Sequence, residues 1–435
     1  MLNSDQLSAL KQIQSWWVSK DLYMILDGAG GTGKSHLLHE VINSLNCEPL
    51  LLCPTNEALK QLRDKVQGDY IFKTIHSALG IAPTTHLDEV SFEQVALPNI
   101  WDNINLCIVD ECSMVSEELL KILTDIGKKI LFVGHKSQLP PVKKNKGIFD
   151  KCVSPVFSKG YKAVTLNIPM RNKGELWDFN NHLEKMIYTS DTLVPNKFDI
   201  KKAELAEYIN STQGIKDVFE ERTKFVLWSN SGVDQYNQLL REVIYGITTA
   251  RKSKYIKGDK IILIKPLTVV EQLETYTEKA LAQFATKNTL ESLYSNTKAE
   301  VVDCKVVTVC LNKQLSVDCY KITVKCNGIL TYFYELKQLK DIDKIENYYK
   351  MLAWNKKTAM DKARAFKLLH FMVSLFADIK HSYAQTAHRL QGSSIDTVIV
   401  IDSDIKKNMN IIEQKKCRYV ATSRCINRLM FYRGN

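Results

Sequence analysis

GAGGTGKS, residues 28–35, follows the short apolar run LYMIL at residues 22–26. The segment matches the pattern G-x-x-x-x-G-K-[ST] between a predicted strand and a predicted helix, which is the setting of a phosphate-binding loop. Glycines free backbone N–H groups to wrap phosphates, and the N-terminus of the following helix favours negative charge. The lysine of this motif reaches the β- and γ-phosphates, and its last hydroxyl can ligate Mg²⁺. We therefore expect ATP and Mg²⁺ to bind Gly28, Gly30, Gly31, Thr32, Gly33, Lys34 and Ser35.

The first third of the chain alternates between apolar strand-like runs and helical patterns. Strands are predicted at residues 22–26, 49–53, 106–110 and 130–134, with helices beginning at Ser35 and Asn56. The alternation returns near Leu166, with strands predicted at residues 225–229, 397–402 and 428–433. Short apolar runs between helices are typical of a parallel sheet covered on both faces. The sequence therefore predicts an α/β fold.

Two stretches interrupt this alternation. Residues 81–104 carry turn formers around a short polar and aromatic run, which predicts a hairpin inserted in the first lobe. Residues 255–376 combine helical patterns with the β-like runs VVDCKVVTVC, CYKITVKC and ILTYFYEL. The second insertion is therefore expected to be a small barrel supported by helices.

The composition is that of a globular protein with a basic excess. Its 435 residues suggest two or three domains. Lys and Arg outnumber Asp and Glu by 59 to 48, and the net charge of +11 fits either a polyanionic partner or a simple solubility charge. No run approaches the roughly 18 apolar residues of a membrane span, and the N-terminus resembles no signal peptide. We expect a cytoplasmic protein without a membrane partner.

Eleven cysteines form an odd set without a C-x-x-C pair, which argues against a secreted disulfide framework. Cys304, Cys310, Cys319 and Cys326 lie close together in the sequence, but their spacing is unlike that of structural zinc ligands. We expect no metal there.

The dipeptide Asp110–Glu111 ends a predicted buried strand of the first lobe. One carboxylate can hold Mg²⁺ while its neighbour orients or deprotonates an attacking water. Two acidic residues after a strand are by themselves more often a solvated turn. The preceding phosphate-binding loop favours the catalytic interpretation.

Several short blocks, taken in order, resemble the motifs of superfamily 1 helicases, specifically the RecD-like and Dda-like branch called superfamily 1B. The blocks are LNSDQLSAL (residues 2–10), PTNEA (54–58), TIHSAL (74–79), DECSM (110–114), GHKSQLPPV (134–142), YAQTAHRLQGSS (383–394) and RYVATSR (418–424). The resemblance implies two RecA-like lobes, at residues 1–80 with 105–165 (lobe 1A) and 166–254 with 377–435 (lobe 2A). It also implies a strand-separating pin at residues 81–104 (1B) and an SH3-like barrel with helices at residues 255–376 (2B).

The resemblance also assigns roles in ATP turnover. It makes Gln6 the adenine reader, Gln138 the sensor of the γ-phosphate, and Arg171 and Arg424 two arginine fingers. Lys34, Asp110 and Glu111 complete the implied catalytic set, with Ser35 and Asp110 as Mg²⁺ ligands and Gly392 in the ATP site. Two departures from the family pattern stand out: His135 replaces the usual aspartate of GHKSQ, and Ile168–Pro169 replace an acidic residue before Arg171.

For nucleic acid the resemblance implies contacts that grip phosphates or stack on bases without reading sequence. The implied residues are Pro54, Thr55, Asn56, Thr74, His76, Asn230, Thr386 and His388, with Phe92 near the tip of the pin. Outside this context His76 would more often be a buried histidine and Phe92 a packing residue.

The implied activity is an ATP-dependent DNA helicase that moves 5′ to 3′ as a monomer in replication or recombination, of the kind phages encode. Its implied partners are single-stranded DNA, junctions of single and double strands, single-strand-binding protein and replisome proteins. The sequence leaves two alternatives open. One is an RNA helicase of the same superfamily, because phosphate grip seldom excludes a 2′-hydroxyl. The other is a translocase or clamp that displaces proteins with little unwinding.

Overall fold

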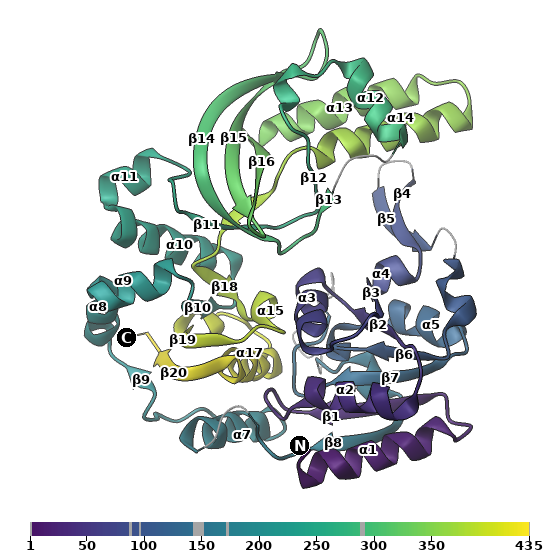
Figure 1. Ribbon diagram of the computed structural model, residues 1–435. Coiled ribbons are helices and arrows are strands. Elements are labelled where there is room, and N and C mark those ends of the chain that lie inside the picture. Colours follow the sequence, from purple (N-terminus) through teal and green to yellow (C-terminus); the bar gives the residue numbers. More distant parts are fainter. Residues whose placement is uncertain are drawn as a thin grey trace. The chain divides into compact units, whose positions relative to one another are not determined.

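The computed structural model describes residues 2–86, 89–94, 97–141, 152–170, 174–287 and 292–434. The chain divides into two compact units (Figure 1). The first unit comprises Met1–Pro83, Phe92–Tyr236 and Tyr383–Asn435, and the second comprises Thr84–Ser91 and Asn237–Ser382. The first unit contains two separate parallel sheets, and the second contains an antiparallel sheet.

The first sheet has six parallel strands in the order β3-β2-β6-β7-β1-β8. The strands are β1 (Tyr23–Gly28), β2 (Leu50–Cys53), β3 (Ile71–Thr74), β6 (Leu106–Val109), β7 (Lys129–Gly134) and β8 (Lys162–Leu166). The helices of this part are α1 (Ser4–Trp17), α2 (Lys34–Leu45), α3 (Asn56–Lys65), α4 (Ile75–Ala78), η1 (Asn99–Asn103), η2 (Cys112–Met114), α5 (Glu117–Asp125) and α6 (Pro155–Ser158). We call this sheet with its helices the first lobe.

The alternation of side chains along the strands gives the first lobe a core on each face of the sheet. Met24 and Leu26 of β1 pack with residues of α1 and α2, whereas Ile25 between them packs with Trp101 and residues of α5. Because both faces are covered, the central strands β1, β2, β6 and β7 are buried along nearly their whole length, as expected for a parallel sheet, whereas the edge strands β3 and β8 are partly exposed.

The second sheet has five parallel strands in the order β18-β10-β19-β20-β9. They are β9 (Asp199–Ile200), β10 (Thr223–Leu227), β18 (Ala384–Thr386), β19 (Ile395–Ile401) and β20 (Cys425–Tyr432). The helices are α7 (Glu175–Ile187), α8 (Lys202–Asn210), α9 (Thr212–Phe219), α10 (Asn230–Tyr245), α15 (Ala387–Leu390), α16 (Asp402–Ile405) and α17 (Ile411–Ser423). We call this sheet, with α7–α9 and α15–α17, the second lobe.

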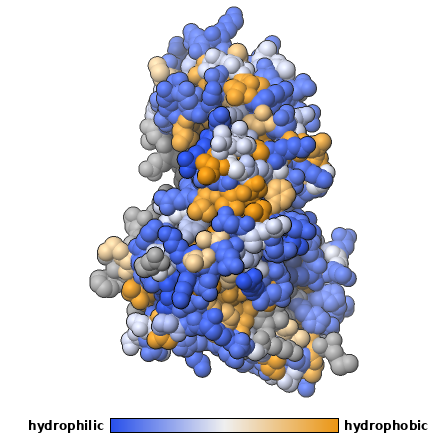
Figure 2. Space-filling model, turned by 90° about the vertical axis from the view of Figure 1, so that its left-hand side faces the viewer, coloured by the Kyte–Doolittle hydropathy of each residue, from blue (hydrophilic) through white to orange (hydrophobic). Residues whose placement is uncertain are grey.

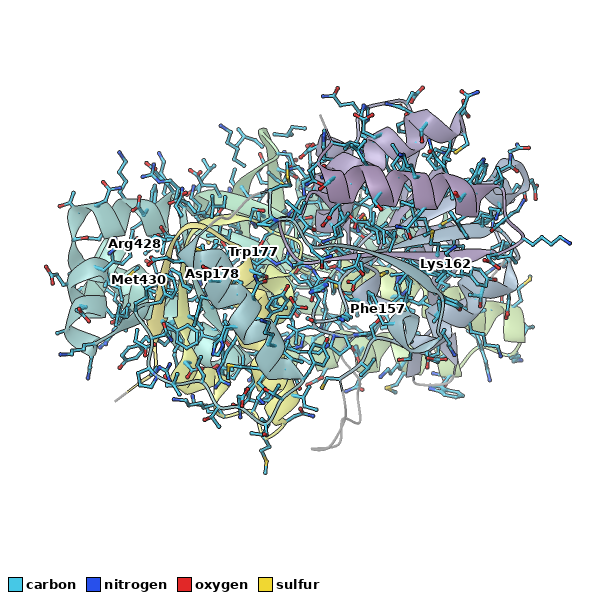
Figure 3. All side chains as sticks on the ribbon, turned by 90° about the horizontal axis from the view of Figure 1, so that it is seen from below. Phe157, Lys162, Trp177, Asp178, Arg428 and Met430 are labelled. Atoms are coloured by element: carbon cyan, nitrogen blue, oxygen red, sulfur yellow. The ribbon has the colours of Figure 1, made fainter. Side chains whose placement is uncertain are left out.

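Helix α7 belongs to the second lobe although it directly follows the first lobe in sequence. Its residues Phe179, Leu183, Met186 and Ile187 join the core formed by β19, β20 and α17. Seen from below, Trp177 and Asp178 of α7 lie on the same side as Arg428 and Met430 of β20, whereas Lys162 of β8 lies on the other side (Figure 3).

The second unit is built on an antiparallel sheet of order β16-β15-β14-β11-β17. Its strands are β11 (Lys260–Leu263), β14 (Lys298–Cys310), β15 (Ser316–Cys326), β16 (Ile329–Leu336) and β17 (Ile379–His381). The backbone N–H of Ala377 donates to the carbonyl of Tyr334 at 2.6 Å, so the segment before β17 meets β16 and the sheet curls back on itself. The remaining elements are α11 (Ile247–Lys252), β12 (Leu267–Thr268), η3 (Leu273–Thr275), α12 (Glu278–Lys287), β13 (Ser292–Leu293), α13 (Lys340–Trp354) and α14 (Ala359–Ser374).

The structure confirms the predicted fold class, with two parallel α/β sheets and a β-rich insertion supported by helices. Strands β4 (Ile81–His86) and β5 (Glu89–Gln94) pair with each other within the region expected to form a hairpin. The second unit runs from residue 237 to residue 382, beyond the expected insertion at 255–376, because β17 pairs with β11 of the insertion. The functional division into 1A, 1B, 2A and 2B stays a prediction.

Hydrophilic residues predominate on the face shown in Figure 2, where hydrophobic residues gather in smaller patches. Exposed apolar side chains of the second unit include Val306, Leu330 and Met351. Across the described residues, no helix combines the length and apolar character needed to span a membrane.

Candidate nucleotide site

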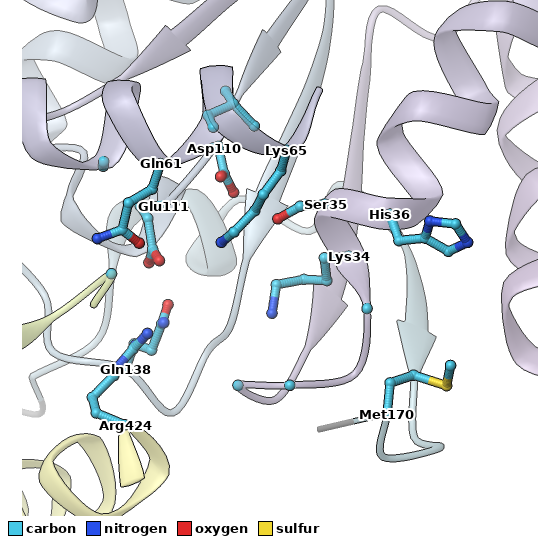
Figure 4. Close-up of a pocket in the computed structure, with 16 residues that line it drawn as sticks. Lys34, Ser35, His36, Gln61, Lys65, Asp110, Glu111, Gln138, Met170 and Arg424 are labelled. Carbon is cyan, nitrogen blue, oxygen red and sulfur yellow. The ribbon is translucent and has the colours of Figure 1, made fainter. Parts of the chain in front are cut away.

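A pocket of about 420 Å³ lies at the carboxyl end of β1, which is large enough for a nucleotide-sized ligand (Figure 4). It collects side chains and backbone from both lobes of the first unit. Ten of its lining residues are among those expected from the sequence: Gly30, Gly31, Gly33, Lys34, Ser35, Asp110, Glu111, Gln138, Gly392 and Arg424. Residues distant in the sequence and expected to act on one nucleotide therefore meet in one pocket.

The phosphate-binding loop has a backbone that only glycine adopts without strain at two positions. Gly31 and Gly33 have φ values of +88° and +82°, and Gly33 caps the N-terminus of α2. A Cβ atom on Gly28 would lie 2.7 Å from the Thr32 hydroxyl oxygen, and that hydroxyl donates to the carbonyl of Ala29 at 2.9 Å. Gly28 and Thr32 therefore shape the loop rather than line the pocket.

Lys34 folds back on the phosphate-binding loop. Its ammonium donates to the carbonyls of Gly28 at 2.5 Å and Ala29 at 3.0 Å. Burial lowers the pKa of Lys34, although Glu111 and Asp110 act in the opposite direction. The cation is thus held beside the pocket by carbonyl oxygens, which phosphate oxygens can replace.

The two carboxylates of the pocket follow β6. Burial, reinforced by the neighbouring Glu111, raises the pKa of Asp110 to about 6. Glu111 has a left-handed backbone, with φ at +51°, an uncommon conformation for a residue other than glycine. Strain of this kind is often found at functional sites.

Two opposite charges of the pocket lack hydrogen-bond partners within the part of the chain that the structure describes. They are the Oε2 atom of Glu111 and the Nε and Nη2 atoms of Arg424, all of them buried. Glu111 comes from the first lobe and Arg424 from the end of α17 in the second lobe (Figure 4). Buried polar atoms are normally paired, so these atoms are suited to a charged ligand and its water.

Gln138 is linked to both lobes by a buried chain of hydrogen bonds. The hydroxyl of Ser113 donates to Gln138 Oε1 at 3.1 Å, and Gln391 Nε2 donates to the same hydroxyl at 2.9 Å. Ser113 belongs to the DECSM block, Gln138 to GHKSQLPPV and Gln391 to YAQTAHRLQGSS. These hydrogen bonds therefore connect three of the sequence motifs. Their approach was not predicted, because it depends on the pairing of two lobes.

Gln6 lies beside the phosphate-binding loop and is fully buried. Its side chain caps α1 together with Asn3, and its Nε2 atom donates to the carbonyl of Gly33 at 3.4 Å. It does not line the pocket, and its role as adenine reader stays a prediction.

Sequence reasoning missed several residues of the pocket. Gln61 and Lys65 lie four residues apart on α3 and line one wall, where the amine of Lys65 points into the cavity (Figure 4). His36 and Met170 line the opposite side. The i, i+4 spacing on the helix after PTNEA was the available signal for the first pair, but any amphipathic helix offers the same spacing.

Three of the predicted nucleic-acid residues share one local structure. Thr55, Thr74 and Thr386 each stand at the carboxyl end of a strand and cap the next helix, because their hydroxyls accept from backbone N–H groups at 3.2–3.4 Å. Pro54 and Asn56 flank the first of these caps, and Asn230 is the first residue of α10. The threonines thus lie at helix N-termini, which favour the phosphate groups of a strand.

The two predicted histidines follow two of these threonines. Burial lowers the pKa of His76, which favours its neutral form. His388 Nε2 lies 3.4 Å from a carboxylate oxygen of Glu413. With Cys417 these two form the one group of three possible metal ligands among the residues that the structure describes, and the four cysteines at positions 304–326 form none.

Two predicted residues cannot be placed in this way. Arg171 lies outside the described residues. Phe92 belongs to β5, but its side chain lies outside what the structure describes. Their assignments stay predictions.

Comparisons with known proteins agree with the resemblance drawn from the motifs. Residues 1–182 match the family model of an AAA domain. The chain is 23% identical to the ATP-dependent DNA helicase dda of Enterobacteria phage T4, over 92% of each chain, and 23% identical to an uncharacterized protein of Acanthamoeba polyphaga mimivirus, over 98% of each. Among solved structures, Bacteroides Pif1 bound to ssDNA aligns with a TM-score of 0.53 at 17% identity, covering 100% of this chain and 92% of that one.

Proposed function

We propose that this protein is an ATP-dependent DNA helicase of the superfamily 1B type, moving 5′ to 3′ along single-stranded DNA. The observation that carries the proposal is the single pocket where the phosphate-binding loop, Glu111 and Gln138 of the first lobe meet Arg424 of the second. The similarity to the phage T4 helicase over 92% of both chains supports it.

In this proposal ATP hydrolysis uses residues from both lobes. The ammonium of Lys34 exchanges its carbonyl partners for phosphate oxygens. Glu111 orients the attacking water and takes its proton as the bond between the γ-phosphorus and the bridging oxygen breaks. Arg424 stabilises the charge that grows on the phosphoryl oxygens, so turnover requires the lobes to be closed.

Mg²⁺ fits the donors of this site. Two observations support a cation here: the buried Oε2 of Glu111 has no hydrogen-bond partner among the described residues, and the pKa of the neighbouring Asp110 is raised. Ser35 and Asp110 would hold the ion. When bound, Mg²⁺ would neutralise part of the charge of the phosphate groups.

For the DNA strand, the capping threonines Thr55, Thr74 and Thr386 supply helix N-termini for phosphates. Pro54, Asn56, His76, Asn230 and His388 complete the proposed contacts, and Phe92 separates the strands. Closing and opening of the lobes then alternates the grip and moves the protein along the strand. The proposal places this activity in the cytoplasm, that of a bacterial host if a phage encodes the protein, with single-strand-binding protein or replisome proteins as partners.

The test is ATP-dependent strand separation on DNA duplexes with a 5′ tail, a 3′ tail or no tail, with ATP turnover measured in parallel. Opening of the 5′-tailed duplex alone would support both activity and direction. Opening of the 3′-tailed duplex alone would keep the helicase but reverse the direction. Turnover stimulated by DNA without any opening would indicate a translocase or clamp, and stimulation by RNA alone would indicate an RNA helicase.

A further inference from the structure

His135, one of the two departures from the family pattern, lies between the buried carboxylate of Asp27 and the partly buried carboxylate of Glu184. Its Nδ1 atom is 2.7 Å from Asp27 Oδ1, and its Nε2 atom is 3.0 Å from Glu184 Oε1. The side chains are 5%, 8% and 20% exposed, in the order His135, Asp27 and Glu184. A neutral imidazole carries no charge, so the ion pair between His135 Nε2 and Glu184 requires the protonated form.

The three residues come from three separate segments. Asp27 belongs to β1 and directly precedes the phosphate-binding loop, whereas His135 directly follows β7. Glu184 belongs to α7, whose apolar residues pack in the core of the second lobe. The ion cluster therefore joins the two lobes next to the nucleotide pocket.

The loop that begins at His135 is held by the second lobe at each of the next four residues. Ser137 donates to Glu184 at 2.9 Å, and Lys416 of α17 donates to the carbonyls of Lys136 and Gln138, both at 2.9 Å. Leu139 packs in the core of the second lobe. The position of Gln138 in the pocket thus depends on how this loop is attached to the second lobe.

We propose that His135 is a positioning residue whose protonated ring joins Asp27 to Glu184, fixes the loop of Gln138 to the second lobe, and makes ATP turnover depend on its proton. This inference rests on the proposed function. Loss of the proton removes the positive charge between Asp27 and Glu184 and leaves the two carboxylates without a counter-charge. The attachment between the lobes then weakens and Gln138 leaves its productive position, because partly paired buried charges are costly.

The charges around the ring favour the protonated form. Burial alone would lower the pKa of His135, but its hydrogen bonds with Asp27 and Glu184 raise it above the ordinary value. Burial would raise the pKa of either carboxyl group, but the hydrogen bond with His135 lowers both below their usual range. The contribution of the cluster is complete where the histidine is protonated and both carboxylates are ionised. It is lost as pH rises through the raised pKa of His135, and also at acid pH as pH falls through the lowered pKa values of the carboxylates.

The other titratable groups facing the cluster come from four segments. Tyr188 follows α7, Tyr419 and Lys416 belong to α17, Lys136 is the next residue in the loop, and Cys112 is the first residue of η2. Burial raises the pKa of Tyr188, Tyr419 and Cys112, so these groups stay neutral where His135 changes charge.

The first test measures DNA-stimulated ATP turnover from pH 6 to pH 9.5 in the wild type and in variants. In His135→Gln, which has no titrating ring, kcat should fall roughly tenfold with little change in KM, and the alkaline decline should disappear. In Glu184→Gln, which keeps an acceptor but loses a charge, the decline should move to lower pH by about one unit. His182→Gln, an exposed histidine on the same helix, is the matched control and should keep the wild-type profile.

The second test follows the proton itself, without catalysis. In protein labelled at histidine, the NMR signal missing from His135→Gln is assigned to His135 and titrated in the wild type and in Glu184→Gln. The proposal expects titration above the ordinary histidine value of about 6.5, shifted downward in Glu184→Gln. Titration at or below that value, or an unchanged alkaline decline in His135→Gln, would overturn the proposal. A wild-type protein without any DNA-stimulated turnover would instead refute the proposed function, and the NMR result would still stand.

Discussion

The nucleotide pocket and the interior of the second unit both bury charged side chains, but they differ in how these charges are paired. In the second unit, Arg241 donates to both oxygens of Asp259 at 3.1 and 3.0 Å and to the carbonyls of Ala250 and Ser253 at 3.3 and 2.9 Å. The pair is 2% and 0% exposed, so it is a closed structural contact. In the pocket, buried atoms of Glu111 and Arg424 have no hydrogen-bond partner among the residues that the structure describes. Saturated buried charges indicate architecture, whereas unsaturated ones indicate a place for a charged ligand.

Lys34→Ala should have the largest effect of the four substitutions, and it should impair the nucleotide pocket without affecting the second unit. ATP turnover should fall by at least about a thousandfold, because the phosphates lose their principal cation, while the fold is retained. Steady-state ATP hydrolysis with and without single-stranded DNA measures the effect, and circular dichroism checks the fold. Lys11→Ala, at an exposed position of α1, is the control. Wild-type turnover in Lys34→Ala would show that the pocket is wrongly assigned.

Arg424→Ala should reduce kcat by about a thousandfold, within the range for removal of an arginine finger. Because two nitrogen atoms of the Arg424 guanidinium have no hydrogen-bond partner in the described part of the chain, its loss should leave the thermal stability of the nucleotide-free protein nearly unchanged. Turnover and melting temperature are measured on the same preparation. Arg428→Ala, an exposed arginine on β20, should change neither. A large loss of stability in Arg424→Ala would mean that the residue is structural.

Asp259→Ala should have the opposite profile and destabilise the second unit by about 3–5 kcal/mol, because it leaves Arg241 buried without its counter-charge. Hydrogen exchange of peptides from residues 237–382 should rise more than that of peptides from the first unit. Burial would raise the pKa of Asp259, but contacts with His381 and Arg241 lower it below its usual range. The contribution of this carboxylate is therefore complete above about pH 4 and lost as pH falls through the lowered pKa. Uniform exchange across both units would contradict this local role.

Arg251→Ala should have the smallest effect. Arg251 pairs with Glu242 at 2.7 Å, but its side chain is 67% exposed, and exposed ion pairs contribute little to stability. Denaturant unfolding of this variant should overlap with that of the wild type. If Arg251→Ala lowered the free energy of unfolding as much as Asp259→Ala does, the exposure of an ion pair would not predict its contribution to the stability of this unit.

The parts of the fold and the site that could be predicted from the sequence are those whose residues lie together in one short continuous segment. The phosphate-binding loop and the Asp110–Glu111 pair have their chemistry within a few residues, and the structure places both in the pocket. The central parallel strands were also predictable, since their apolar runs follow from burial on both faces, whereas the four edge strands β3, β8, β9 and β18 were not predicted.

The parts that could not be predicted depend on side chains that meet only after folding. Asp27, His135 and Glu184 come from segments separated by more than 40 residues, and each has an ordinary local sequence. Only the departure at His135 was visible beforehand. The extension of the second unit to residue 382 was missed because β17 is a short strand whose partner, β11, lies far away in the sequence.

The two ends of residues 237–382, the long segment of the second unit, lie close together. The side-chain amide of Asn237 donates to the carbonyl of His381 at 2.8 Å, which joins the first residue of this long segment to the residue before its last. A segment whose two ends meet behaves as a cassette, because its length hardly affects the path of the chain on either side. Over evolutionary time such a cassette can be enlarged, trimmed or exchanged while the strands on either side keep their order, so the diversity of this protein and its relatives can accumulate there without rebuilding the motor.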